Sequence, residues 1–85
     1  MFYVYILRSF EDEKFYIGFT ADLDRRIKEH LAGTNHTTSR MKNPQLICYE
    51  AFLSEFDAKR REAYFKTSKG KKTLRLMLRN SLEMK

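Results

Sequence analysis

The sequence predicts an α+β fold: a three-stranded antiparallel sheet flanked by helices, in the order β-β-α-β-α-α. Three short runs of β-branched and aromatic residues are typical of strands, and the segments around them carry helical spacing or helix-capping residues. With 85 residues, 42% of them hydrophobic, and only three glycines and one proline, the chain has a globular composition. We expect one domain over residues 1–85.

The first two strands are expected to form a hairpin, because residues 2–7 and 15–19 are separated by a short polar loop. Side chains alternate between the two faces of a strand. Tyr3 and Tyr5 therefore share one face of the first strand, and Tyr16 shares a face of the second strand with Gly18. We expect the three tyrosines to lie on one surface of the sheet.

The next helix is expected over residues 22–31, with Asp22 or Thr20 as its cap and Gly33 at its end. Apolar residues at i, i+4 and i+8 form the narrow buried stripe of a helix lying on a sheet. The stripe consists of Leu23, Ile27 and Leu31. A polar loop follows, in which we interpret His36 as a surface residue, and residues 46–53 form the third strand.

Two more helices are expected to complete the chain. Ser54 and Asp57 have the spacing of a capping box and predict a helix that ends near Lys66. Gly70 is expected to break the chain before a last helix over residues 71–82. We expect the buried face of that helix to consist of Leu74, Met77, Leu78 and Leu82, and another face to carry Lys71, Arg75 and Arg79.

The charge distribution favours a polyanionic partner. The formal net charge is +6, and Glu62 is the only acidic residue between Lys59 and Arg79. Such a field suits nucleic acid, although an ordinary solvated helical surface would show the same pattern. The candidate DNA-binding residues are Lys66, Lys69, Lys71, Lys72, Arg75 and Arg79.

Cysteine usage and hydrophobicity predict a cytoplasmic protein with no membrane partner. Cys48 is the only cysteine, so neither a disulfide within the chain nor a structural zinc site is expected. The apolar N-terminal stretch is interrupted at Arg8, which makes it shorter than the apolar region of a signal peptide and far shorter than a membrane span.

Five residues in matching order give the chain a resemblance to the GIY-YIG nuclease family. They are Tyr16 and Gly18 of the Tyr-Ile-Gly motif, Arg26, His30 and Glu62, and Tyr3-Val4-Tyr5 stands where the family has its first motif. The resemblance covers nearly the whole chain. Within this family, the chain resembles the nuclease domains of the excision-repair endonuclease and of group I intron homing endonucleases. The segments Thr38-Ser39-Arg40, Cys48-Tyr49-Glu50 and Arg61–Lys66 resemble small standalone bacterial members.

The resemblance implies hydrolysis of DNA phosphodiester bonds with one carboxylate-bound Mg²⁺ or Mn²⁺. It implies catalytic roles for Tyr5, Tyr16, Arg26 and His30, metal binding by Glu62 and a structural role for Gly18. Tyr16 would act as general base or position the attacking water. Tyr5 would hold water or phosphate, and His30 would relay a proton or orient a tyrosine hydroxyl. The alternative for Tyr16 is a packed sheet tyrosine.

Helix geometry separates Arg26 from its neighbour Arg25. At about 100° per residue, Arg26 lies about 60° from Leu23 around the helix, whereas Arg25 lies about 200° away. Only Arg26 then borders the buried stripe and flanks the tyrosine surface, where its planar guanidinium suits a phosphate. We interpret Arg25 as a solvated charge.

Glu62 is the candidate metal ligand, and the alternative is that Glu62 forms an ion pair with Arg61 or Arg26.

Some family members carry a lysine directly after the second-motif glycine, but this chain has Phe19 and Thr20 there. Either that cationic contact is missing from this chain, or it comes from elsewhere, with Lys66 or Lys69 as the candidates. Besides a structure-directed endonuclease, two other functions stay open: a catalytically silent nucleic-acid-binding module, and a domain whose basic face docks an acidic protein partner.

Overall fold

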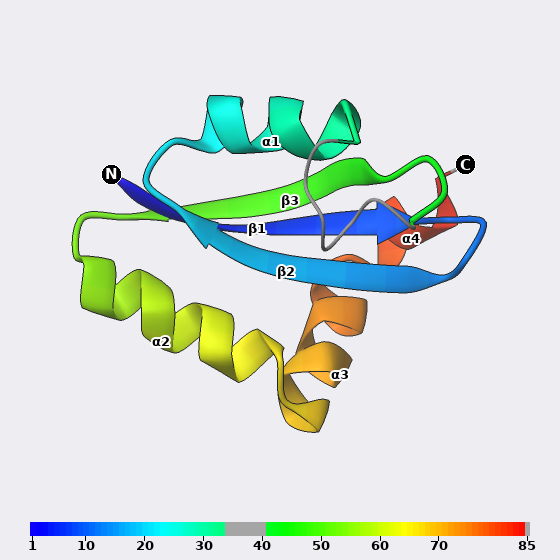
Figure 1. Cartoon of the computed structure of the whole chain (residues 1–85). Coiled ribbons are helices and arrows are strands. Elements are labelled where there is room, and N and C mark those ends of the chain that lie inside the picture. The colour runs from blue at the N-terminus through cyan, green and yellow to red at the C-terminus, as the bar shows by residue number, and fades with distance from the viewer. Residues whose placement is uncertain (34–40, 85) are drawn as a thin grey trace.

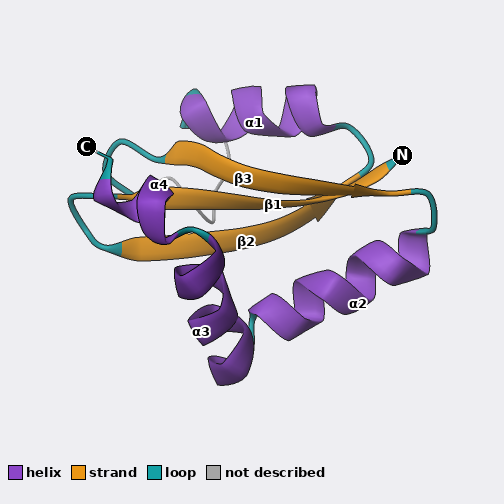
Figure 2. Ribbon diagram, turned by 180° about the vertical axis from the view of Figure 1, so that it is seen from behind, coloured by secondary structure: helices purple, strands orange, loops and turns teal. Residues whose placement is uncertain are grey.

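A computed structural model describes residues 1–33 and 41–84 of the chain. Three strands form one antiparallel sheet in the order β2-β1-β3. The strands are β1 (Phe2–Ser9), β2 (Lys14–Thr20) and β3 (Gln45–Phe52), and the helices are α1 (Leu23–Leu31), α2 (Glu55–Phe65), α3 (Ser68–Met77) and α4 (Arg79–Glu83). Helix α1 covers one face of the sheet, while α2 and α3 lie on the opposite face (Figures 1 and 2). The predicted fold class and element order are confirmed.

The central strand β1 is buried on both faces. Its even-numbered residues Val4 and Ile6 belong to the main apolar core, which lies on the side of α2 and α3. The other members of this core are Ile17, Ala58, Phe65, Leu74 and Leu78. On the face toward α1, Tyr5 and Leu7 are fully buried as well. The core therefore anchors α2 and α3 below the sheet and leaves the tyrosine face to α1.

Helix α1 begins where the sequence predicts. The Asp22 carboxylate accepts a hydrogen bond from the backbone amide of Arg25 at 3.2 Å, and Thr20 Oγ1 accepts one from the amide of Asp22 at 3.0 Å. The predicted buried stripe is wrong at its last position, because the side chain of Leu31 is 58% exposed and His30 is 1% exposed. Since Leu31 is the last residue of the helix, His30 is the residue of the final turn that packs against the sheet.

The predicted chain break at Gly70 is wrong. Gly70 lies in the first turn of α3, and a Cβ there would overlap the backbone of Tyr64 and Phe65. The glycine thus allows α3 to pack directly against the end of α2. Thr67 caps α3 by accepting a hydrogen bond from the Gly70 amide at 3.0 Å.

Three further details differ from the prediction. The last helix is interrupted at Leu78 and continues as the short α4. Met77, expected in the core, is 43% exposed because it lies at the end of α3. Ser54 is the N-cap of α2, but its side chain makes no capping hydrogen bond, so the capping box is not formed.

None of the helices in the described parts of the chain has the length and hydrophobicity needed to cross a bilayer. His36 and the Thr38-Ser39-Arg40 segment lie outside the described residues.

Candidate active site

Tyr5, Tyr16 and His30 meet between the sheet and α1. The Tyr5 hydroxyl lies 2.8 Å from His30 Nε2. The ring of His30 lies 5.1 Å from that of Tyr16 and 5.5 Å from that of Tyr5, measured between centroids. Tyr3 points to the same face of the sheet but contacts Tyr49 of β3 instead, at 6.1 Å. Two of the three tyrosines expected on one surface therefore form one cluster with the histidine.

Gly18 makes room for this cluster. It lies directly opposite Tyr5 in the β1–β2 register, and a Cβ at Gly18 would overlap the ring and hydroxyl of Tyr5. Any side chain at position 18 would push the Tyr5 hydroxyl away from His30. The expected structural role of Gly18 thus has a physical basis, a close approach between neighbouring strands.

The electrostatics of the site keep Tyr5 and His30 neutral near pH 7. Burial raises the pKa of Tyr5, as does the neighbouring Tyr16, while the positive charge of Arg26 acts in the opposite direction. Burial and the charge of Arg26 lower the pKa of His30, against a smaller opposing effect of Glu29. A neutral imidazole and a protonated phenol can share one hydrogen bond without burying a charge.

We expected Tyr5 to hold a water or a phosphate. Its side chain is fully buried, and its hydroxyl is hydrogen-bonded to His30 Nε2. Tyr16 is only half-buried and is the tyrosine of the cluster that retains access to solvent. The two tyrosines of the motifs are therefore suited to different tasks.

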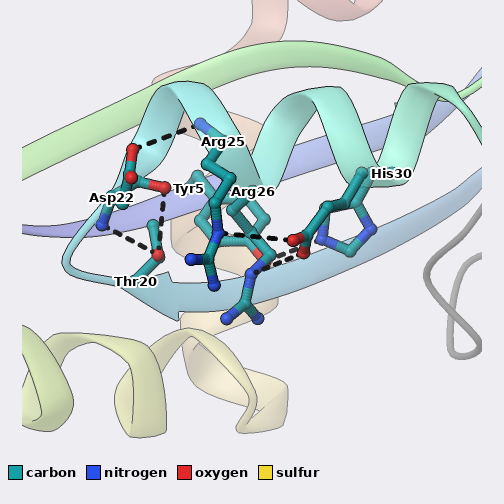
Figure 3. Close-up of polar contacts among 7 residues, drawn as sticks. Tyr5, Thr20, Asp22, Arg25, Arg26 and His30 are labelled. Carbon is teal, nitrogen blue, oxygen red and sulfur yellow. Dashed lines mark hydrogen bonds and ion pairs between the residues drawn. The ribbon is translucent and has the colours of Figure 1, made fainter.

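Arg26 lies beside this cluster, as helix geometry predicts. Figure 3 shows Arg26 and His30 extending from α1 toward the sheet. The Arg26 side chain is 33% exposed and that of Arg25 is 70% exposed. Both arginines form ion pairs with Glu29, at 3.5 Å for Arg26 Nε and 3.4 Å for Arg25 Nε. The Arg26 Nε atom is shielded from solvent and makes no hydrogen bond within the described residues.

Sequence reasoning missed Glu29 as the shared partner of these two arginines. The signal was present, because an acid placed three and four residues after two arginines on one helix is in reach of both.

Glu62 lies on α2, the helix that covers the opposite face of the sheet from α1. Its Oε2 atom lies 3.1 Å from Lys66 Nζ, and its side chain is 23% exposed. Both predicted alternative partners are wrong. Arg61 instead binds Glu50 through two hydrogen bonds of 2.8 and 3.2 Å, and Arg26 pairs with Glu29. The partner of Glu62 is therefore Lys66, one helical turn further along the chain, and neither arginine.

The residues around Glu62 fit one kind of metal site. Within the described residues there is no cluster of three or more His, Cys, Asp or Glu side chains that could hold an ion. A single partly exposed carboxylate fits a Mg²⁺ or Mn²⁺ ion that takes its other ligands from waters and substrate phosphate. It does not fit a cation cage made by the protein alone.

The candidate DNA-binding residues lie away from the tyrosine–histidine cluster. Lys66 follows α2, and Lys69, Lys71, Lys72 and Arg75 belong to α3, on the opposite face of the sheet from α1, while Arg79 begins α4. All six are exposed, but Lys66 is paired with Glu62. The structure thus brings together Tyr5, Tyr16, Arg26 and His30, and it separates them from the basic helices.

Comparison with known proteins places these residues in a family. The model of the GIY-YIG catalytic domain matches residues 1–75. A UPF0213 protein of Clostridium perfringens is 36% identical over 84 residues, which cover 98% of this chain and 89% of that protein. A UPF0213 protein of Pediococcus acidilactici is 32% identical over 84 residues, covering 95% and 85% of the two chains.

A solved structure agrees with this assignment. The solution NMR structure of a UPF0213 protein from Bacillus halodurans has a TM-score of 0.56 at 38% identity, and covers 92% of this chain and 85% of its own. The chain therefore belongs to the GIY-YIG catalytic domain family, a nuclease family in which its relatives of similar size are UPF0213 proteins.

Proposed function

We propose that this protein is a metal-dependent endonuclease that hydrolyses phosphodiester bonds of DNA. The observation that carries the proposal is the packing of Tyr5, Tyr16 and His30 against Arg26 in a chain of a nuclease family. An in-line attack on a phosphodiester needs an activated water, cations for the charge that develops on the phosphate oxygens, and help for the leaving group. The cluster offers groups for the first two requirements.

Tyr16 is the residue proposed to contact the attacking water, since Tyr5 is fully buried behind it. Tyr5 is proposed to hold His30 through the 2.8 Å hydrogen bond, which fixes the imidazole that packs against Tyr16. In this arrangement Tyr5 is a positioning residue. His30 is neutral and can accept or pass on a proton at neutral pH.

Arg26 is the proposed phosphate ligand. Its planar guanidinium can give two parallel hydrogen bonds to phosphate oxygens. Among the described residues, its Nε makes a 3.5 Å ion pair with Glu29 and no hydrogen bond, so a phosphate competes with a weak contact. Because the charge of Arg26 already lowers the pKa of His30, a bound phosphate that neutralises Arg26 would ease protonation of the imidazole.

Glu62 is the proposed ligand of one Mg²⁺ or Mn²⁺ ion, which when bound would stabilise negative charge on the phosphate and acidify a bound water. To bind the ion, the Glu62 carboxylate has to release or share Lys66, which lies 3.1 Å away. The side chain is partly exposed, and such surface ion pairs contribute only about 0–1 kcal/mol, so this exchange costs little.

Cleavage directed by DNA structure fits the residues better than cleavage directed by sequence. The cations on α3 and α4 are exposed lysines and arginines, suited to the phosphate contacts that position DNA without reading its bases. The proposed substrates are therefore duplexes with a flap, junction or lesion.

A nicking assay tests the proposal. Plasmid, flap, junction and single-stranded DNA are incubated with the protein in Mg²⁺, in Mn²⁺ and in EDTA, beside a Tyr16→Phe variant prepared in parallel. We expect cleavage of at least one substrate that requires the metal and is lost in the variant. Absence of cleavage on every substrate in both metals would reject the proposal.

The second candidate is a catalytically silent nucleic-acid-binding module. The ion pair between Glu62 and Lys66 favours it, because the one carboxylate proposed for the metal already has a partner. This candidate predicts salt-sensitive DNA binding with no metal-dependent cleavage in the same assay.

A further inference from the structure

A second group of cations surrounds Phe15, on the sheet face opposite the tyrosine–histidine cluster. The Arg8 guanidinium lies 4.6 Å from the centroid of the Phe15 ring, and that of Arg75 lies 5.8 Å from it. A depression of about 280 Å³ opens beside them, lined by Glu13, Lys14, Phe15, Lys71 and Arg75. Residues from the β1–β2 hairpin and from α3 thus build one basic site.

Within the described residues, the cations of this site form no ion pair, unlike those of α1 and α2. Lys14 has a weaker interaction with an acid: the pKa of Asp12 is lowered mainly by a hydrogen bond from the Lys42 amide and also by the charge of Lys14. In α1 and α2 every lysine and arginine forms an ion pair: Arg25, Arg26, Lys28, Lys59, Arg60 and Arg61. Within the described residues, Arg8, Lys14, Lys71 and Arg75 form none. Glu13 lines the same depression without an ion pair to them.

Arg8 points most directly to an anionic ligand. It lies on the central strand, and its Nε atom is shielded from solvent without a hydrogen-bond partner in the described residues. A shielded donor without a partner is costly, and the contact with the Phe15 ring offsets only part of the cost. An anion held by Arg75 and the two lysines in the depression, next to the Arg8 guanidinium on the same Phe15 ring, would relieve the mutual repulsion of the cations.

The position of the site restricts the kind of nucleic acid that can use it. Phe15 and Tyr16 are consecutive residues of β2, so their side chains point to opposite faces of the sheet. Within the described parts of the chain, β2 is an edge strand that pairs with β1 alone. A ligand that contacts Tyr16 on one face and the Phe15 site on the other has to bend around that edge. Duplex DNA, with a persistence length of about 50 nm, resists such a bend, whereas a single strand does not.

We infer that Arg8, Lys14, Lys71 and Arg75 form a phosphate-binding site for a single-stranded segment of nucleic acid that crosses the β2 edge from the Tyr16 side. This inference rests on the proposed function and adds to it a second contact surface and the form of the substrate. Phe15 holds the two guanidinium groups in place, and the phosphates of the strand are the ligands.

Binding measurements without metal test the inference separately from cleavage. Fluorescence anisotropy in EDTA follows a labelled single-stranded oligonucleotide, and its duplex, over a range of salt concentrations. For single strands, each lost phosphate contact reduces the slope of log K against log salt by about 0.7. Lys71→Ala/Arg75→Ala should therefore reduce the slope by about 1.4, and Arg8→Met, which keeps the aliphatic packing, by about 0.7.

The matched control is Lys59→Ala/Arg60→Ala, which removes the same two charges from exposed, ion-paired positions on α2. Its slope should equal that of the wild type. Equal losses in the control and test variants, or duplex binding as tight as single-strand binding, would overturn the inference. So would an equal loss of affinity for phosphatidylserine vesicles, since the site would then bind any anionic surface.

Cleavage data keep the two proposals apart. If the wild type cuts DNA but Lys71→Ala/Arg75→Ala has the same slope of log K against log salt as the wild type, this inference fails and the proposed function stands. If the slope responds as expected and no substrate is cut, the inference stands and the proposed function fails. If Arg8→Met does not fold, the slope of Lys71→Ala/Arg75→Ala, which changes only exposed residues, decides the test.

Discussion

Gly18→Ala should destabilise the protein by about 2–3 kcal/mol, because the new Cβ would overlap the ring and hydroxyl of Tyr5. Overpacking a buried site costs about 1–3 kcal/mol, and loss of the hydrogen bond between Tyr5 and His30 adds about 1 kcal/mol. The unfolded Gly18→Ala chain has less conformational entropy than the unfolded wild type, which offsets about 0.5 kcal/mol of this loss. For a domain of this size, the melting temperature should fall by roughly 10–20 °C.

Urea and thermal denaturation of the wild type, Gly18→Ala, Tyr5→Leu and the Tyr5→Leu/Gly18→Ala double variant check this reasoning. In the Tyr5→Leu background the ring is absent, so the alanine should cost less than about 1 kcal/mol. Gly33→Ala is the control, since Gly33 has φ 74° and no atom of the described residues near its Cβ position. It should cost about 1 kcal/mol from backbone strain in either background. Equal costs of Gly18→Ala in both backgrounds would refute the contact with Tyr5 as the reason for the glycine.

Three further outcomes follow from the site. Arg26→Ala should lower the cleavage rate about 10²-fold in single-turnover assays and Arg25→Ala far less, and equal losses would contradict the burial difference between them. Tyr16→Phe should keep the melting temperature and lose most cleavage, and unchanged turnover would exclude Tyr16 from the mechanism. Burial lowers the pKa of His30, so the unfolded chain takes up the proton more readily. The stability that His30 contributes is therefore complete above about pH 6.5 and is lost as the pH falls through the folded pKa, and His30→Gln should flatten that part of the profile in urea denaturation. Parallel profiles of wild type and variant would contradict the shift.

Local patterns in the sequence predicted the parts of the site that depend on one element at a time. The strand runs and their alternation predicted that Tyr3 shares a face with Tyr5 and that Tyr16 shares a face with Gly18. The observed register, in which Tyr5 lies opposite Gly18, brings these two sets to the same face. The helical wheel separated Arg26 from Arg25 for the same kind of reason.

Features that depend on contacts between different helices and strands could not be predicted from local sequence patterns. Gly70 resembles a helix breaker in sequence, and only the approach of α3 to the backbone of Tyr64 shows that it is a packing residue. The partner of Glu62 depends on which of several nearby cations reaches it, and composition does not decide that. The basic site around Phe15 joins the hairpin to α3, which lie far apart in the chain.

The order of the elements also left open which face of the sheet each helix covers. Helical spacing identified the exposed cations of α3 but not their position relative to Tyr16. The structure places α1 on one face and α3 on the other, so the basic helix and the tyrosine–histidine cluster can share a ligand only around an edge of the sheet.

Glu62→Gln tests the proposed nuclease most directly, because it keeps the shape of the side chain and removes the charge that would hold the ion. Losing the exposed ion pair with Lys66 should cost no more than about 1 kcal/mol, so the variant should stay folded. Thermal stability, DNA affinity and nicking in Mg²⁺ are measured on one sample. We predict that cleavage vanishes while the fold persists and DNA binding is kept or strengthened. A folded Glu62→Gln variant that nicks DNA in Mg²⁺ at the wild-type rate would contradict the assignment of the metal to Glu62.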